Sequence, residues 1–405
     1  MLKKIKHELN YFSFNDIIGC FLFLISLVPA SVIKIYLILK KRKIWLITED
    51  KNEARDNGIC FFRYINSIKS DITSYYAIKY NSTDYKKVAT IGNTVRYGSI
   101  KHWILYLNAE YNISTQKSGR PSAAVGYVLE MLGIVKNKAI FLQHGITLSR
   151  AKWLFYENTK MRLFICGAKP EYEYVLNEFG YPAANVAYLG LCRFDDYHRK
   201  HEIKRQLLLI PSWREWIGSK NEYSKVYEDT SRFEKTEYYK KYQSLINNPL
   251  LEEILEKNNL ELVFYPHRNM QQYISSFSTC CDKIRIVDNK TSDIRELLID
   301  SALMITDYSS VALDFAYMKK PVVFYQFDEE RFREAQYEKG YFNYRTCKLG
   351  IWTCTEEQVL NAIQEVVLRR FSTDSDFDQA HSAYFQLYDN KNCERIYLHI
   401  KGLKK

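Results

Sequence analysis

The sequence lacks the glycine-rich loops with which many nucleotide-binding enzymes hold phosphates. No GxxxxGK[ST] run occurs in the 405 residues, and no GxGxxG follows an apolar run. The first absence excludes a Walker-type triphosphate site, and the second argues against a nicotinamide enzyme, because these motifs supply the backbone N–H groups that bind the phosphates. No clear DxD pair follows an apolar run either, which weakens the case for a metal-dependent sugar-nucleotide enzyme.

Cysteine is present without any pairing pattern. The nine cysteines are odd in number, form no CxxC and are scattered along the chain. This distribution argues against a disulfide framework and a zinc site, and it indicates a reducing cytoplasm. His198 and His201 lie three apart in HRKH, with no cysteine or acidic residue at ligand spacing, so we interpret them as part of a solvated basic linker. We therefore expect no bound metal and no cofactor.

Positive charge is in excess, with a formal net charge of +11. Such an excess favours an anionic partner, which can be nucleic acid, a phosphorylated metabolite or an anionic lipid. Because the excess is spread along the chain, a merely basic soluble protein is an alternative. The sequence has no RNA-module signature, no zinc-finger spacing and no basic helix with heptads, so we expect no nucleic-acid partner.

One long apolar run is present, near the N-terminus. It extends from Ile17 to Ile33, is interrupted by Pro29, and at about 17 residues is at the short end of what spans a bilayer. Basic residues flank it on both sides, so the charge asymmetry of a spanning segment is missing. No small-residue cleavage site is obvious, which argues against a removed signal peptide.

We expect this segment to attach the protein to a membrane from one side. Past Pro29, VIKIYLILKKRK has the pattern of a helix that buries its apolar face in the interface. The side chains expected to contact phospholipid headgroups on the cytoplasmic face of the membrane are Lys34, Lys40, Lys41, Arg42 and Lys43. A true membrane span and a buried core helix are the alternatives.

From residue 44 onward, short apolar runs alternate with helix-length segments. The first series of predicted strands is KIWLIT (43–48), KVATIG (87–92), AIFLQHG (139–145), RLFICG (162–167) and NVAYLGL (185–191). The second is LLLIPS (207–212), LELVFYPH (260–267), KIRIVD (283–288), SALMITD (301–307) and PVVFYQF (321–327). This alternation predicts an α/β fold with parallel sheets, as two doubly wound domains that face a cleft.

We predict the boundaries from these series and from the charged stretch DDYHRKHEIKRQ (195–206), which we interpret as the interdomain linker. The polar, tyrosine-rich segment 216–245 is expected to include an irregular insertion. The predicted parts are a membrane-associating segment (1–43), two Rossmann-like domains (44–198 and 199–370) and a C-terminal helical tail (371–405).

Polar side chains follow several of the predicted strands, where open parallel sheets bind their ligands. They are His144 and Gly145 after AIFLQ, Ser212, Trp213 and Arg214 after LLLIP, His267 and Arg268 after LVFYP, and Asp307, Tyr308, Ser309 and Ser310 after ALMIT. Any one of them could be a satisfied core or surface group. Their joint position at strand ends predicts a binding or catalytic site.

The serine pair in ITDYSSVALDF has two interpretations. It can be ordinary turn chemistry, with Ser309 or Ser310 capping the helix through VALDFAYM. It can also bind a diphosphate on the first-turn amides, where the helix dipole adds roughly 0.3–1 kcal/mol. Asp314 lies one turn further on, where it could hold a ribose hydroxyl or orient the serines. The neighbouring strand ends favour the diphosphate.

Seven segments together resemble the CDP-glycerol glycerophosphotransferase family, the teichoic-acid and capsule enzymes of bacteria. In chain order they are EARDNGICFFRY, GSIKHWILYLNAEY, FLQHGIT, LGLCRFD, PSWRE, YPHRNM and ITDYSSVALDFAYMKKPVVFYQFD, from about residue 44 to 330. Two departures stand out: PSWR replaces the expected PTWR, and LCRFD lacks the proline that often precedes the arginine. Without the long N-terminal extension of the large polymerases, the chain resembles the shorter primase- or capsule-type members.

The resemblance implies a GT-B fold, peripheral membrane attachment and transfer of glycerol phosphate from CDP-glycerol with release of CMP. The expected acceptor is a polyprenyl-diphosphate-linked glycan, bound by the N-terminal domain, whereas the C-terminal domain binds the CDP-alditol. A CDP-ribitol-dependent transferase is the nearest alternative, followed by a GT-B glycosyltransferase that uses a nucleotide sugar and by a non-catalytic polymer-binding protein.

The resemblance also assigns roles to individual residues. His144 is the expected base, and His267 is expected to act on the donor phosphates or the leaving group. The other donor-binding residues are Trp213, Arg214, Arg268, Asp307, Ser309, Ser310 and Asp314. The candidate acceptor residues are Gly145, Arg193, Asp195, Arg55 and Asn57.

Overall fold

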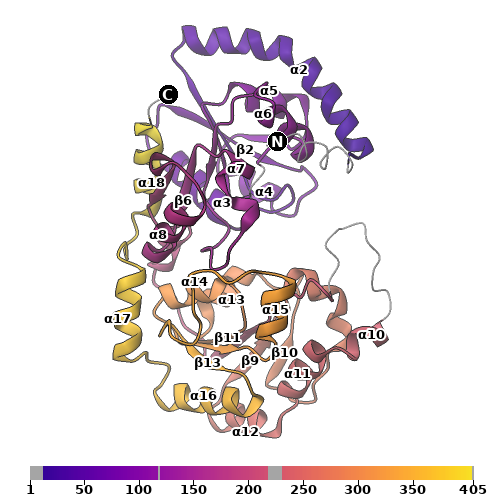
Figure 1. Cartoon of the computed structure of the whole chain (residues 1–405), viewed down its shortest axis with the longest axis vertical. Helices are drawn as coiled ribbons and strands as arrows, with labels where there is room; N and C mark the ends of the chain where they lie inside the picture. Colours follow the sequence, from indigo (N-terminus) through magenta and orange to yellow (C-terminus); the bar gives the residue numbers. More distant parts are fainter. Residues whose placement is uncertain (1–11, 117–118, 218–229, 404–405) are drawn as a thin grey trace. The chain divides into compact units, whose positions relative to one another are not determined.

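The computed structural model describes residues 12–116, 119–217 and 230–403. It divides the chain into two compact units (Figure 1). The first unit comprises Met1–Gly145, Lys152–Asp196 and Asp389–Lys405, and the second comprises Ile146–Ala151 and Tyr197–Tyr388. Each unit has its own sheet and its own core.

The first unit has a seven-stranded parallel sheet in the order β3-β2-β1-β4-β5-β6-β7. The strands are β1 (Lys43–Thr48), β2 (Ile72–Ile78), β3 (Thr94–Arg96), β4 (Tyr111–Ser114), β5 (Ala139–Phe141), β6 (Leu163–Cys166) and β7 (Val186–Tyr188). The order reverses between β1 and β4, as in a Rossmann-like sheet, and the strand ends beside this reversal are where such sheets bind ligands.

Both faces of this sheet are covered, because successive side chains of a strand point to opposite faces. Trp45 and Ile47 of β1 belong to one core cluster, whereas Ile44 and Leu46 belong to another. The helices of this unit are α2 (Phe14–Leu39), α3 (Asn57–Ser67), α4 (Tyr85–Ala89), α5 (Ile100–Asn108), α6 (Ala123–Met131), α7 (Tyr156–Thr159), α8 (Lys169–Glu178) and α18 (Asn392–Gly402), with short turns η1 (Lys152–Leu154) and η2 (Ala183–Asn185).

The second unit repeats this plan with six parallel strands in the order β10-β9-β8-β11-β12-β13. They are β8 (Gln206–Ile210), β9 (Glu261–Phe264), β10 (Ile284–Ile286), β11 (Leu303–Thr306), β12 (Val322–Tyr325) and β13 (Ile351–Thr353). Its helices are α10 (Thr230–Glu234), α11 (Glu237–Leu245), α12 (Pro249–Lys257), η3 (Arg268–Ser276), α13 (Ile294–Asp300), α14 (Val311–Tyr317), α15 (Glu329–Ala335), α16 (Glu356–Leu368) and α17 (Ser375–Tyr384). The short helix α9 (Phe194–Tyr197) lies at the boundary of the two units.

The predicted parallel α/β architecture is confirmed, but one predicted strand is wrong. Residues 87–92 were predicted as a strand, whereas α4 ends at Ala89 and the chain then turns. Val88 is fully buried and Tyr85 packs against the same core cluster, whereas Lys86 and Lys87 between them are exposed. Two side chains three residues apart lie on one face of a helix, so this contact holds the short helix in place. The insertion predicted within 216–245 falls largely on residues 218–229, outside the described residues, and α10 and α11 follow it.

The C-terminal residues 371–405 do not form a separate tail. α17 belongs to the second unit and α18 to the first. The buried face of α18 includes Ile396 and Ile400, which belong to the same core cluster as Trp45. Asp195 receives hydrogen bonds from the backbone N–H groups of Asn392 (2.8 Å) and Cys393 (2.9 Å), so the stretch that we interpreted as a solvated linker begins by fixing this helix.

α2 continues through Pro29 as one helix of 26 residues, rather than restarting after the proline. By length and composition it could cross a membrane. Within the first unit it runs along α5 and α6 (Figure 1). The ring of Phe23 meets that of Trp103 edge-on at 5.4 Å, and Asn108 donates to the carbonyl of Ala30 at 3.0 Å. Contacts on both sides of Pro29 therefore hold the helix together.

Candidate active site

A histidine–aspartate pair lies at the carboxyl end of the first sheet. His144 follows β5, and Asp56 is the residue directly before α3. Nδ1 of His144 lies 2.6 Å from Oδ2 of Asp56. The other carboxylate oxygen of Asp56 accepts a hydrogen bond of 2.6 Å from Arg193. The two side chains come from positions 88 residues apart in the sequence.

The pair combines an exposed ring with a buried carboxylate. The His144 side chain is 75% exposed, whereas that of Asp56 is only 12% exposed. Because Asp56 holds Nδ1, a neutral ring carries its proton on Nδ1 and its lone pair on Nε2. This tautomer can accept a proton from a bound hydroxyl, as the histidine of a Ser-His-Asp triad does.

The charges around the pair shift the pKa values of both His144 and Asp56. The nearby carboxylate of Asp56 raises the pKa of His144, through its charge and its hydrogen bond. Burial alone would raise the pKa of Asp56, but His144 and Arg193 outweigh it and lower that pKa. Asp56 is therefore an anion at neutral pH, and the protonated form of His144 persists to higher pH than in an isolated histidine.

Backbone contacts fix the position of the ring. Asn57 donates to the carbonyl of Gln143 at 2.8 Å, and its own side-chain oxygen accepts from the N–H of Arg193 at 3.0 Å. Arg193 also donates to the carbonyl of His144 at 2.7 Å. Gln143 has a φ of +66°, a conformation that few residues other than glycine adopt, and its side chain is held by the buried Glu171 at 2.6 Å.

The structure thus divides the candidate acceptor residues into those beside His144 and those with other partners. It brings Asn57 and Arg193 to His144, with Gly145 as its chain neighbour. Arg55 instead pairs with Asp84 at 2.9 Å, and Asp195 is engaged at the start of α18. Sequence reasoning missed Asp56 itself, although an aspartate directly before the apolar segment ICFF, separated from it only by Asn57 and Gly58, is typical of a helix N-cap.

In the second unit, Arg214 lies in the interior at the ends of β8, β11 and β12. Its guanidinium is fully buried and contacts Asp328 through two hydrogen bonds of 2.7 and 3.0 Å and Asp307 at 2.8 Å. Burial would lower the pKa of Arg214, but these two carboxylates raise it well above its ordinary value. Asp307 also accepts from the N–H groups of Ser212 (2.8 Å) and Tyr308 (2.7 Å), so it fastens two strand ends together.

The direct donor contacts predicted for Arg214 and Asp307 do not agree with this burial, because both side chains are 0% exposed. Asp314, predicted to bind a ribose hydroxyl or to orient the serines, is 1% exposed and accepts a hydrogen bond of 3.0 Å from Tyr197. All three carboxylate and guanidinium groups are thus committed to contacts within the protein. Their role in this structure is to hold strand ends and helices in place.

The other predicted donor residues have accessible surface. The rings of Trp213 and His267 stack with centroids 6.4 Å apart, and Arg268 next to them is exposed. Nδ1 of His267 accepts from the N–H of Asn269 at 3.2 Å, which places the ring proton on Nε2. His267 is therefore a donor at Nε2, whereas a neutral His144 is an acceptor there.

The serine pair lies at the start of α14. Ser310 precedes the helix with a helical backbone and no side-chain capping bond, and Ser309 accepts a weak bond of 3.4 Å from the N–H of Val311. Both serines are half-buried. Weak engagement leaves both hydroxyls with hydrogen-bonding capacity for a ligand.

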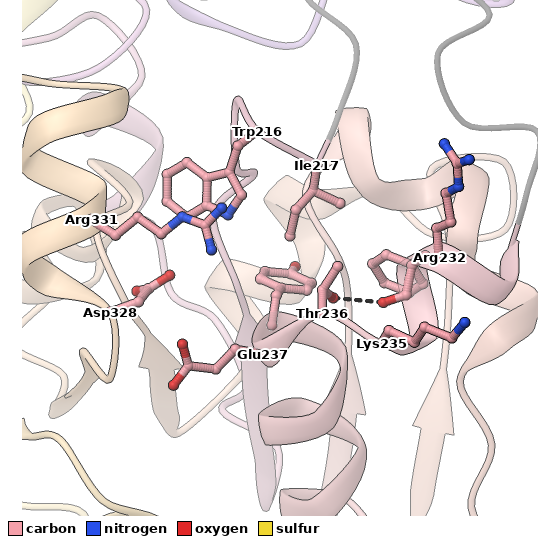
Figure 2. Close-up of a pocket in the computed structure, with 10 residues that line it drawn as sticks. Trp216, Ile217, Arg232, Lys235, Thr236, Glu237, Asp328 and Arg331 are labelled. Carbon is pink, nitrogen blue, oxygen red and sulfur yellow. Dashed lines mark hydrogen bonds between the residues drawn. The ribbon is translucent and has the colours of Figure 1, made fainter.

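A cavity of about 360 Å³ lies beside the cluster of Arg214, Asp307 and Asp328. It is bounded by the loop after β8 and by the helices α10, α11 and α15. Figure 2 shows Arg331 reaching across the ring of Trp216, with the carboxylates of Asp328 and Glu237 on the same side. The guanidinium carbon of Arg331 is 4.7 Å from the ring centroid. Asp328 connects this cavity to Arg214. None of the predicted donor residues is among the side chains that line it.

Within the part of the chain that the structure describes, no three His, Cys, Asp or Glu side chains gather into a group that could hold a metal ion. The accessible candidate side chains of each unit are imidazoles, guanidiniums and hydroxyls, and the first unit adds the Asp56 carboxylate that holds His144. These groups suit phosphate and hydroxyl ligands.

Comparison with known proteins agrees with this chemistry. The chain is 30% identical over 380 residues to the minor teichoic acid biosynthesis protein GgaB of Bacillus subtilis, a match that covers 92% of this chain and 41% of that protein. This chain therefore spans about two fifths of the relative's length. A teichoic acid poly(glycerol phosphate) polymerase of Bacillus spizizenii is 31% identical over 111 residues, 27% of either chain.

Solved structures support the fold. The wall teichoic acid polymerase TagF superimposes with a TM-score of 0.62 at 15% identity, over 92% of this chain and 97% of that one. A putative UDP-N-acetylglucosamine 2-epimerase from Listeria monocytogenes gives a TM-score of 0.56 at 14% identity, over 89% and 96% of the two chains. Residues 30–402 match the family described as CDP-glycerol:poly(glycerophosphate) glycerophosphotransferase. The chain belongs to this family of teichoic-acid transferases.

Proposed function

We propose that this protein transfers glycerol phosphate from CDP-glycerol to a hydroxyl group of a polyprenyl-diphosphate-linked glycan, in the synthesis of a teichoic-acid or capsule-type polymer. The observation that carries the proposal is the exposed His144 ring held by the buried Asp56 carboxylate. Such a pair activates a hydroxyl, and membership in the family supplies the class of donor. Neither a binding protein nor a structural protein needs a base in this form.

In the proposed step, Nε2 of His144 takes the proton of the acceptor hydroxyl. The oxygen then attacks the β-phosphorus of CDP-glycerol, and a new oxygen–phosphorus bond forms in line with the bond that breaks. The bond between the β-phosphorus and the bridging oxygen breaks, and CMP leaves with the electron pair. The products are the glycerol-phosphate ester, CMP and protonated His144.

Donor recognition is assigned to the second unit. Nε2–H of His267 and the guanidinium of Arg268 would stabilise the charge that develops on CMP, and Ser309 and Ser310 would bind the diphosphate. Trp213 supports the His267 ring by stacking. Arg214 and Asp307 contribute indirectly, because they fix the strand ends that carry these residues.

CMP release tests the function directly. We expect the purified full chain to release CMP from CDP-glycerol in the presence of a lipid-linked disaccharide, with glycerol phosphate found on the acceptor by mass analysis. CDP-ribitol and nucleotide sugars are the comparison donors, because some relatives matching part of this chain are poly(ribitol-phosphate) polymerases. Preference for CDP-ribitol would change the donor and keep the mechanism, whereas turnover of a nucleotide sugar alone would overturn the proposal.

Membrane attachment through α2 is part of the proposal. One face of α2 packs on its own unit, and the opposite side carries many exposed apolar side chains, including Phe21, Leu24, Val28, Val32 and Ile35. Lys34 and Lys40 on the same helix end are exposed and suit anionic headgroups. Lys43 was expected to contact headgroups as well, but it begins β1 and pairs with Glu110 at 3.1 Å. The proposed location is the cytoplasmic face of the membrane.

Charged residues on the outer face of α2 should prevent this attachment. Leu24 and Val28 are 60% and 74% exposed, so Leu24→Asp with Val28→Asp removes apolar contact without disturbing the packed face. We expect the fraction bound to phosphatidylglycerol-containing vesicles to fall about tenfold or more, because each large apolar side chain contributes about 1.5–3 kcal/mol when buried. Leu368→Asp is the control, since Leu368 is 84% exposed on α16. Unchanged sedimentation of the double variant would contradict membrane binding through this face.

A further inference from the structure

The first residue after β1 is a buried acid with an unusual set of partners. Glu49 is only 6% exposed, and its carboxylate accepts hydrogen bonds from three backbone N–H groups. These are the N–H groups of Arg55 (2.8 Å), Asp56 (3.1 Å) and Ile59 (2.6 Å). All three belong to the turn that carries Asp56 and to the first turn of α3.

Glu49 performs the task that an N-cap side chain usually performs. The side chain before a helix normally accepts from the N–H of the second or third helical residue. Here Asp56 is that residue, but the N–H of Ile59, the third helical residue, bonds to Glu49 instead. Asp56 accepts only from its neighbour Asn57, at 2.7 Å, and otherwise turns outward to Arg193 and His144. Glu49 thereby leaves the Asp56 carboxylate available for His144.

The space for the Glu49 carboxylate depends on a glycine. A Cβ atom on Gly58 would lie 2.7 Å from Cγ and 2.9 Å from Oε1 of Glu49, which is closer than nonbonded atoms approach. Gly58 has no positive φ, so its backbone does not itself require glycine. The glycine is needed here because the carboxylate occupies the position of its missing side chain.

We propose that Glu49 is a positioning residue for the proposed reaction, which holds the turn of Asp56 so that Asp56 can orient His144. The inference rests on the proposed role of His144 as the base. Glu49 itself touches neither His144 nor any reacting atom among its described contacts. It acts through the backbone of residues 55–59.

The charges around Glu49 and His144 predict that loss of Glu49 also changes the pKa of His144. Burial and the charge of Asp56 raise the pKa of Glu49 to about 7, although the three backbone hydrogen bonds lower it. The Tyr76 phenol also faces Glu49. The charges of Asp56 and Glu49 raise the pKa of His144, with Asp56 giving the larger effect, and the charge of Arg193 lowers it. Loss of Glu49 should therefore lower the pKa of His144.

The test uses the full chain with Glu49→Gln. Glutamine keeps the volume but offers a single acceptor oxygen, and its NH₂ group faces backbone N–H donors. We expect kcat for CMP release to fall about 100-fold with little change in KM for CDP-glycerol, as misplacement of a catalytic group does. Histidine labelled with ¹³C and ¹⁵N, assigned with His144→Asn, should show a lower pKa and a changed tautomer for His144 without any substrate.

Two further variants keep the result interpretable. Gly58→Ala retains the charge and displaces the carboxylate, so it should reproduce the loss of kcat even if Glu49→Gln folds poorly. Asp374→Asn is the control, because Asp374 caps α17 by accepting from the N–H of Phe377 at 2.9 Å in the other unit. It should lower the melting temperature slightly and leave kcat unchanged.

The NMR titration separates this inference from the proposed function. If Glu49→Gln and Gly58→Ala both leave the pKa and tautomer of His144 unchanged, Glu49 does not position the pair, whatever reaction the protein catalyses. If the titration shifts as expected but His144→Asn retains full activity, the proposed base is wrong and the positioning contact remains. A fall in stability of these variants with unchanged kcat would make Glu49 purely structural.

Discussion

Substituting His144→Asn should lower kcat for CMP release by about 10³-fold or more. Asparagine can keep a hydrogen bond to Asp56, but it cannot take a proton from the acceptor hydroxyl. Removal of a general base typically costs 10²–10⁴-fold, and loss of the correct histidine arrangement in a triad costs about 10⁴-fold. The measurement is a single-turnover assay with CDP-glycerol and the lipid-linked acceptor. Because His144 is largely exposed, the melting temperature should stay within a few degrees of the parent protein.

The matched control is His201→Asn. His201 is an exposed histidine in the second unit, remote from β5 in the sequence. The same chemical change there should leave kcat and KM unaltered. Near-normal turnover of His144→Asn, or an equal loss in both variants, would remove His144 from its proposed role.

The pH dependence follows from the contact with Asp56. A base must be neutral to accept a proton, so activity should rise as pH increases through the pKa of His144. Asp56 raises that pKa above the ordinary value near 6.5, so the acid limb of kcat/KM should have its midpoint above that value. Asp56→Asn removes the charge, and the midpoint should then move to lower pH while kcat falls. A limb that does not move would show that another group titrates.

Hydrophobic runs predicted most of the fold because the central strands are buried on both faces. β8, β11 and β12 are each apolar along nearly their whole length, and each was predicted within a few residues. β2 and the central strand β4 were missed, since ITSYYAI and YNIS mix serine, threonine, asparagine and tyrosine with few aliphatic residues. β3 and β13 are three-residue edge strands, too short for any periodicity.

The candidate site was predictable only as far as strand ends locate it. His144 and His267 follow apolar runs, so their positions could be predicted from the sequence. Asp56 could not be paired with His144 in this way. The helix α3 follows β1, and only the sheet order β1-β4-β5 brings the end of β5 near the start of that helix. The sequence also gave no sign that Glu49 accepts the hydrogen bonds that Asp56 would otherwise receive.

Arg214 shows that a residue at a strand end need not face a ligand, so its position in the sequence did not predict its surroundings. Its position after LLLIPSW predicted a donor clamp. Asp328, which lies 114 residues further along the chain, instead binds it inside the unit together with Asp307. Burial of a guanidinium is decided by where both carboxylates lie in three dimensions, and single-sequence patterns do not contain that information.

Arg214→Ala should therefore destabilise the second unit by about 3–5 kcal/mol, because it leaves two buried carboxylates without their cation. Asp307 and Asp328 are 0% and 5% exposed, so water cannot replace the lost partner without opening the strand ends. The measurement is urea denaturation followed by tryptophan fluorescence, with Trp213 and Trp216 as probes in the same loop.

Arg369→Ala is the control that isolates burial. Arg369 also lies between two carboxylates, Glu365 and Asp374, but it is 41% exposed and should contribute less than about 1 kcal/mol. Arg214→Lys separates the two interpretations of Arg214, because lysine keeps the charge and loses the two-point contact with Asp328. A structural role predicts lower stability with KM for CDP-glycerol nearly unchanged. A direct clamp predicts a raised KM at unchanged stability, and that result would place the donor phosphates on Arg214 after all.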